Sequence, residues 1–229
     1  IGSGYCQIIS PLVPFEVNLA NQKIGLEVYQ SILGVRPSIA LVNEMAYSDA
    51  VVDLLSSVGY SGLIMDRDNI RLAIDAEKEP VREMPLIAKG IVKSEMPVLW
   101  GDSILFQKLQ HVSHGDISID DYASLITKKV FEGEKILPLY CNDAEIFDYR
   151  PGRFKEERQT NPIGEWEVIR SVLRKLKTDL QIEFILPSEV LVIHKSIAKK
   201  PAKSFTSADY PIPVKKQAKY NIARWAVTG

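Results

Sequence analysis

The chain has 229 residues, 46% of them hydrophobic and 25% charged, and its 28 Lys and Arg residues balance 29 Asp and Glu residues to a net charge of -1. A chain of this length buries a core without disulfides, and its balanced charge gives no sign of nucleic acid or an anionic membrane as a partner. Its two cysteines, Cys6 and Cys141, exclude a disulfide scaffold and favour a reducing, cytoplasmic location. The longest apolar runs, such as 182–193, are broken by proline or glutamate, so no segment is expected to span a membrane.

Short apolar segments alternate with amphipathic ones in the first third of the chain. Residues 18–33 have the spacing of a helix that Gly34 ends, and residues 38–42 have the composition of a buried strand. Ser48 is placed to cap a second helix, and residues 62–66 form a second apolar run. Two short strands joined by a helix are typical of a parallel α/β sheet.

The same patterns continue less regularly along the rest of the chain. We predict further strands over 98–100, 136–141 and 182–186, and further helices over 104–109, 118–130 and from Pro162 to about residue 176. The sequence therefore predicts one α/β fold rather than an all-helical or an all-strand protein.

Acidic side chains follow two of the predicted strands. Glu44 comes soon after the strand at 38–42, and Asp143 and Glu145 come soon after the strand at 136–141. The carboxyl ends of parallel strands line the active site of such sheets and barrels, so we expect these acids to converge on one cleft. A retaining glycosidase needs two carboxyl groups about 5–5.5 Å apart. The same acids would also stabilise helix N-termini without any catalysis, and position alone leaves both interpretations open.

The residues around these acids resemble glycoside hydrolase family 57. Residues 37–47 are similar to the family's Pro-x-Gly-x-Trp-x-Pro-Glu-x-Ala-Tyr pattern, and its nucleophilic Glu falls on Glu44. Residues 143–147, Asp-Ala-Glu-Ile-Phe, resemble its Asp-Ala-Glu-Leu-Phe-Gly motif, and the Asp that serves there as acid/base falls on Asp143. Residues 2–14 resemble the segment just after the family's second motif. The three matches occur in the family's order.

This resemblance runs from residue 1 to about residue 190 and implies an incomplete parallel (β/α)7-type, TIM-like barrel that acts on α-glucans. The implied enzyme is a retaining glycoside hydrolase or glucanotransferase that needs no metal or other cofactor, and its partner is a carbohydrate. The family's first strand is missing, so we expect a barrel truncated at both ends, with a partial catalytic domain over 1–194. Residues 195–229 hold eight Lys or Arg and one acid, and we expect them to be a basic connector into a C-terminal region.

The chain departs from the family pattern close to both acids. Asn43 replaces the usual Pro, Leu41 the usual Trp and Ile39 the usual Gly. The Gly-His-Trp-Trp that the family commonly has after the position of Phe147 is missing here. These changes leave a first alternative open, which is a non-catalytic carbohydrate-binding or regulatory relative of the same barrel.

Further polar and aromatic side chains near predicted strand ends or near the acidic motif are candidates for substrate binding. They are Tyr5, Gln7, Trp100, Asp102, Glu145, Arg153 and Trp225. Trp100 would stack on a sugar face or belong to the core, and Trp225 would reach the cleft or pack elsewhere. Arg150 and Arg153 would hold the neighbouring acids ionised, recognise an anionic sugar or form a surface ion pair.

A second alternative is a polysaccharide deacetylase on a related barrel, which would need an Asp/His/His metal set. His111 and His114 are the metal-like pair of the sequence, but Ser113 and Gly115 predict a loop in which both imidazoles are solvated. His194 is isolated and is interpreted as structural.

Overall fold

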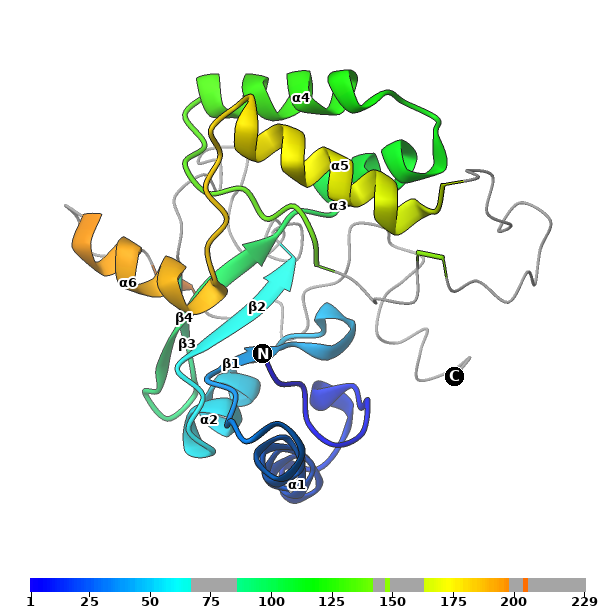
Figure 1. Ribbon diagram of the computed structural model, residues 1–229. Helices are drawn as coiled ribbons and strands as arrows, with labels where there is room; N and C mark the ends of the chain where they lie inside the picture. Colours follow the sequence, from blue (N-terminus) through cyan, green and yellow to red (C-terminus); the bar gives the residue numbers. More distant parts are fainter. Residues whose placement is uncertain (67–85, 142–146, 149–162, 198–203, 206–229) are drawn as a thin grey trace. The chain divides into compact units, whose positions relative to one another are not determined.

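A computed structural model describes residues 1–66, 86–141, 147–148, 163–197 and 204–205 (Figure 1). The chain divides into two compact units, one made of residues 1–100 and 186–229 and the other of residues 101–185. None of the helices in the described part of the chain is long and apolar enough to cross a membrane.

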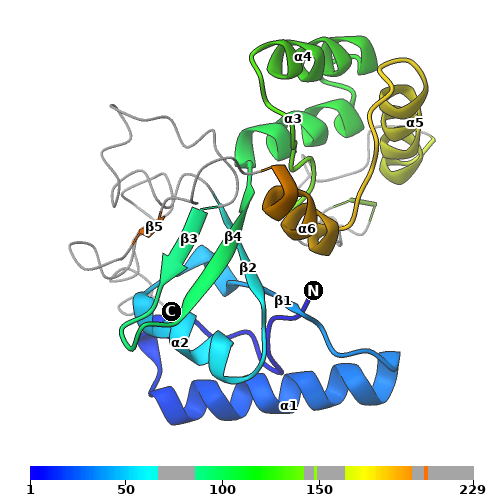
Figure 2. The same cartoon turned by 90° about the vertical axis from the view of Figure 1, so that its left-hand side faces the viewer.

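The first unit is built around a sheet with the strand order β1-β2-β4-β3-β5. Its strands are β1 (Ile39–Leu41), β2 (Gly62–Asp66), β3 (Leu86–Lys89), β4 (Glu95–Gly101) and β5 (Ser204–Phe205). Its helices are α1 (Phe15–Leu33), α2 (Asp49–Ser57) and α6 (Pro187–Ile197), with short 3-10 turns at Ser10–Leu12 and Asn43–Met45. Figure 2 shows β1, β2, β4 and β3 side by side in that order.

The predicted strand–helix–strand unit at the start of the sheet is confirmed. β1 and β2 pair in parallel with Ile39 opposite Gly62, and α2 connects them. The preceding helix α1 starts at Phe15, earlier than predicted, and ends as predicted at Gly34, whose φ of 70° is the left-handed conformation that glycine adopts readily.

The sheet as a whole is mixed rather than parallel throughout. β3 pairs with β4 antiparallel and with β5 in parallel. The β3–β4 connection is short and closed by a hydrogen bond from the Gly90 N–H to the Ser94 carbonyl at 2.7 Å, and a connection this short joins only antiparallel strands. The described part of the fold is therefore mixed α/β with a mostly parallel sheet, and the antiparallel hairpin departs from the all-parallel barrel that the sequence predicted.

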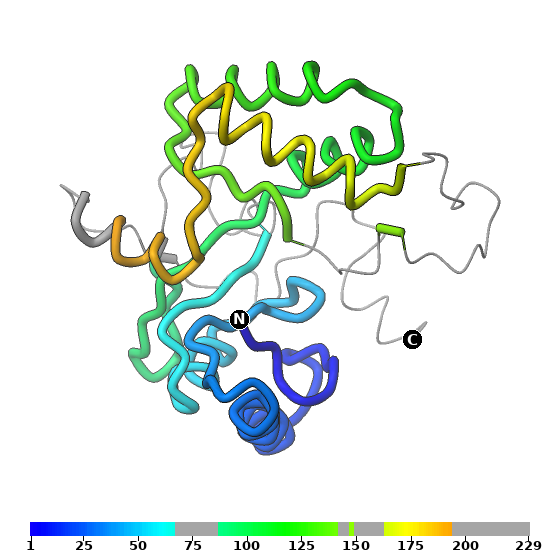
Figure 3. The backbone as a smooth tube through the Cα atoms, viewed as in Figure 1, coloured from blue at the N-terminus to red at the C-terminus, as the bar shows by residue number. Residues whose placement is uncertain are grey.

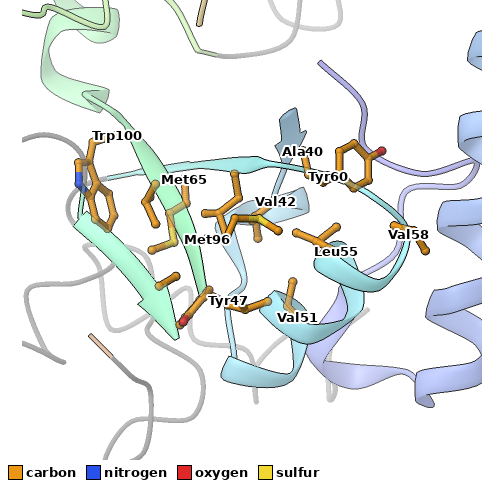
Figure 4. Packing of buried hydrophobic residues seen from close by; sticks show 14 of the residues in the cluster. Ala40, Val42, Tyr47, Val51, Leu55, Val58, Tyr60, Met65, Met96 and Trp100 are labelled. Carbon is orange, nitrogen blue, oxygen red and sulfur yellow. The ribbon is translucent and has the colours of Figure 1, made fainter. Parts of the chain in front are cut away.

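Buried side chains from β1, β2, β4 and α2 form the core of this unit. Figure 4 shows Val51 and Leu55 of α2 facing Met65 and Met96 of the strands, with Trp100 at the end of the cluster beside Met65. These residues are almost completely buried, so they contribute to the apolar area that holds the sheet onto α2.

The second unit is helical where it is described. It contains α3 (Ser103–His114), α4 (Ile119–Phe131) and α5 (Glu165–Thr178). The helix predicted over 118–130 is confirmed as α4 and starts with a capping box, in which the Ser118 hydroxyl accepts from the Asp121 N–H at 3.0 Å while the Asp121 carboxylate accepts from Ser118. These hydrogen bonds from Ser118 lower the pKa of the Asp121 carboxyl below its usual value.

Two predicted strands are wrong. Residues 136–141 and 182–186 are irregular, and their apolar side chains, including Leu137, Leu139 and Ile182, pack against the helical core of the second unit. Short apolar runs fit a strand or a helix-packed coil equally well, and Pro138 donates no backbone hydrogen bond to a sheet.

Candidate functional site

The N-terminal segment lies along the outer edge of β1 and runs in the same direction. The Gly2 N–H donates to the Ile39 carbonyl at 2.9 Å, and the Leu41 N–H donates to the Gly2 carbonyl at 2.8 Å. Figure 3 traces this segment from the N-terminus into α1. Because two parallel segments end at the same edge of a sheet, the residues that follow them meet there. The Gln7 side-chain Nε2 donates a hydrogen bond to the Glu44 carboxylate at 2.8 Å.

Glu44 lies on a strained turn. Its φ of 53° and ψ of 14° are left-handed, and Met45 follows with a φ of 55°. Each such residue costs about 1–3 kcal/mol, and strain of this kind persists only where the surroundings hold it in place. The Met45 N–H donates to the Val42 carbonyl at 3.0 Å, and its side chain packs on the core.

Tyr47 anchors the far end of the same turn. Its ring is completely buried, and its hydroxyl donates to the Asp49 carboxylate at 3.3 Å. Burial is the main reason that the pKa of Tyr47 lies far above its usual value, with Asp49 adding to the effect. The turn that carries Glu44 is therefore fixed by buried groups on both sides.

Three asparagine side chains fix the loop that carries Gln7. Asn21 of α1 both accepts from the Cys6 N–H at 2.7 Å and donates to the Cys6 carbonyl at 3.1 Å. Asn18 donates to the carbonyl of Ser10 at 2.6 Å. Asn43 donates to the Ser3 carbonyl at 3.1 Å, and so takes a structural role at the position where the family pattern has proline. These contacts hold Gln7 in position against Glu44.

The sequence profile of glycosyl hydrolase family 57 matches residues 1–202. The chain belongs to this family. A comparison with curated protein sequences found no match.

Solved structures share the fold of this family 57 chain. The 4-alpha-glucanotransferase from Thermococcus litoralis superposes with a TM-score of 0.63 at 16% identity, over 90% of this chain and 27% of that one. The exo-type maltose-forming amylase from Pyrococcus sp. ST04 superposes with a TM-score of 0.62 at 13% identity, over 90% of this chain and 34% of that one. The chain thus spans about a third or less of the length of these structures.

The second acid of the family 57 pattern lies outside the described residues. Asp143 and Glu145 are in the undescribed stretch 142–146, and Arg150, Arg153 and Trp225 also lie outside the described part. The predicted separation of the Glu44 and Asp143 carboxyl groups therefore stays a prediction.

The last residue of the acidic motif and the residue after it are well anchored. Phe147 is buried in the core of the second unit. Asp148 accepts hydrogen bonds from the Glu165 N–H at 2.7 Å and the Trp166 N–H at 3.0 Å, while its own N–H donates to the Glu165 carboxylate at 2.7 Å. This exchange ties the end of the motif to the first turn of α5.

Two of the predicted substrate-binding residues are structural. Trp100 is only 2% exposed and lies in the core, so it offers no ring face to a sugar and the stacking prediction is wrong. Asp102 is buried as the N-cap of α3, where it accepts from the Ile104 N–H at 3.0 Å and the Leu105 N–H at 3.1 Å, with Lys129 at 3.5 Å. Its carboxylate oxygens accept from the N–H groups at the start of α3 and pair with Lys129, so the prediction that Asp102 binds substrate is also wrong.

Two further predicted site residues lie in the N-terminal loop. Gln7 contacts Glu44 directly, and Tyr5 is exposed in the same loop. Binding of a sugar by either side chain stays a prediction.

The histidine pair lies in the last turn of α3, so the predicted loop is wrong. His111 pairs with Asp116 at 2.8 Å, and His114 pairs with the buried carboxylate of Glu165 at 2.7 Å. The two imidazoles thus have different partners, and within the described residues no group of three or more potential ligands could hold a metal ion. His114 instead links the C-terminal turn of α3 to the N-terminal turn of α5.

Proposed function

We propose that this family 57 chain cleaves or transfers α-glucan-type glycosidic bonds by a retaining mechanism, with Glu44 as nucleophile and Asp143 as acid/base. The observation that carries the proposal is the Gln7–Glu44 hydrogen bond at the carboxyl end of β1, on a turn that keeps Glu44 in a strained conformation. Membership of the family and the names of the two matching enzymes support a carbohydrate substrate of the α-glucan class.

The proposed reaction has two steps. A Glu44 carboxylate oxygen attacks the anomeric carbon, the bond from that carbon to the glycosidic oxygen breaks, and Asp143 gives its proton to the leaving oxygen. Asp143 then takes a proton from water or from a sugar hydroxyl, whose oxygen attacks the same carbon and releases Glu44. Water as acceptor gives hydrolysis, and a sugar gives transfer.

The proposed architecture follows the same family. We propose an incomplete (β/α)7-type barrel, with the catalytic part over 1–194 and a basic connector over 195–229, in which Ser204–Phe205 adds β5 to the sheet. No cofactor takes part in the proposed chemistry, and the proposed location is cytoplasmic.

The test is turnover of a panel of α-linked gluco-oligosaccharides by the protein and by its Glu44→Gln and Asp143→Asn variants. Loss of turnover in both variants is the result expected of a two-carboxylate enzyme. A folded wild-type protein that binds these sugars but leaves all of them intact would instead identify a non-catalytic relative of the family.

Removal of the Gln7 side chain is expected to slow the same reaction. A hydrogen bond to an ionised carboxylate is worth about 1.5–3 kcal/mol, so Gln7→Ala should lower kcat/KM by about 10-fold or more. Gln7→Glu keeps the length of the side chain but places a second carboxylate beside Glu44. Because the two negative charges repel, this variant should lower kcat/KM at least as much. Steady-state kinetics measure both, with Gln30→Ala on the exposed face of α1 as the control that leaves kcat/KM unchanged. Wild-type kinetics for Gln7→Ala would show that Gln7 does not position Glu44.

A further inference from the structure

Two aromatic side chains of the second unit form a half-exposed pair. Tyr140 is 36% exposed and Trp166 is 43% exposed. Their ring centroids lie 6.1 Å apart and their planes are tilted by 30°. The pair thus presents two adjacent aromatic side chains that are partly open to solvent.

Buried aromatic rings hold this pair in place. Phe106 meets Tyr140 edge-on with centroids 5.2 Å apart and planes at 87°, and Phe147 meets Trp166 at 5.4 Å and 71°. Phe106 and Phe147 are both buried. Edge-to-face contacts of this kind stabilise a defined ring orientation, so a ligand that packs on the pair finds its rings already ordered.

Trp166 lies away from the stripe of α5 that faces the core. That stripe consists of Val168, Ile169, Val172 and Leu176, all of them buried. The carboxylate of the exposed residue Asp148 accepts a hydrogen bond from the Trp166 backbone N–H. A carboxylate therefore lies beside the backbone of Trp166.

We propose that Tyr140 and Trp166 form a sugar-binding subsite that packs against a pyranose ring of an α-glucan. This inference rests on the proposed function. A pyranose ring has an apolar face of C–H groups between polar edges, which matches a pair of aromatic faces with a carboxylate nearby.

The subsite lies close along the chain to the proposed acid/base. Tyr140 precedes Asp143 by three residues, and three residues span at most about 11 Å. Phe147, which supports Trp166, follows Asp143 by four residues. Residues that form or support the pair thus flank Asp143 in the sequence, and the role proposed for the pair is to help position a long substrate.

Calorimetric titration with maltoheptaose, an α-1,4-linked gluco-oligosaccharide, tests the subsite. It is carried out on the whole chain in a Glu44→Gln background, so that turnover does not consume the sugar. Trp166→Ala and Tyr140→Ala should each raise the Kd by about 10-fold, and Trp166→Phe should restore part of the affinity because it keeps a ring. The matched control is Phe131→Ala, which removes an 87% exposed aromatic ring from the end of α4 and should leave the Kd unchanged.

Each outcome decides one proposal. Unchanged Kd values for folded Trp166→Ala and Tyr140→Ala proteins, or no binding of maltoheptaose in the parent background, would overturn the subsite. Turnover by the wild-type chain, measured separately, tests the proposed function. If the protein binds maltoheptaose through the pair but cleaves nothing, the subsite is supported and the catalytic proposal is rejected. If it cleaves the sugar and binds it equally well without the pair, the catalytic proposal is supported and the subsite is rejected.

Discussion

Replacement of Glu44 by glutamine should lower kcat on an α-gluco-oligosaccharide by at least about 1,000-fold, because an amide oxygen is far too weak a nucleophile for the anomeric carbon. The substitution keeps the size of the side chain and the acceptor oxygen that Gln7 contacts, so binding of substrate should change little. Steady-state kinetics give both quantities.

Two further variants separate chemistry from folding. Glu27→Gln makes the same chemical change on the exposed face of α1 and should leave kcat within about 2-fold of the wild type. Glu44→Gly should abolish turnover but still fold, because glycine lacks the carboxylate and adopts the left-handed conformation of position 44 without strain. Retention of activity by Glu44→Gln would remove Glu44 from the mechanism.

Replacement of Trp100 by alanine should lower the free energy of unfolding by about 3–5 kcal/mol, since it removes a large buried ring from the core of the first unit. Urea denaturation followed by circular dichroism measures the change. A loss of this size is a large part of the stability of an ordinary domain, so Trp100→Phe serves as the second variant if Trp100→Ala does not fold.

Phe131→Ala is the control for that experiment. It removes an 87% exposed aromatic ring from the end of α4 and should cost about 1 kcal/mol or less of stability. A Trp100→Ala protein of wild-type stability but weakened sugar binding would reverse the assignment of Trp100 to the core.

The first part of the fold could be predicted from the sequence because its local signals agree. The apolar run around Ala40 and the helix end at Gly34 each have one strong structural interpretation, and the structure confirms the strand–helix–strand unit. Ser48 does precede α2 at the N-cap position, but its side chain makes no capping hydrogen bond. The capping box at Ser118 is an equally local signal.

The two wrong strand predictions have a different cause. The runs at 136–141 and 182–186 have strand-like composition, but their side chains pack into a core made of helices, and periodicity cannot identify a packing partner. Trp100 was ambiguous for the same reason, since a tryptophan after a strand is equally suited to a core or to a ligand.

The candidate site could be predicted only in part. Glu44 was identified from its place after a strand and from the family pattern, and Gln7 from its loop, but no sequence signal paired the two. That pairing depends on the parallel bridge between Gly2 and Ala40 and on the amide contacts of Asn21. Such contacts join residues far apart in sequence, which is why only the structure places them together.

Covalent trapping of the reaction intermediate tests the role of Glu44 most directly. A fluorinated α-glucosyl fluoride that forms the glycosyl-enzyme quickly and releases it slowly is incubated with the protein, and the labelled peptide is identified by mass spectrometry. We expect one sugar attached to the carboxylate of Glu44. A label on another carboxylate, or an unlabelled protein that gives a product of inverted anomeric configuration, would contradict the assignment of Glu44 as the nucleophile.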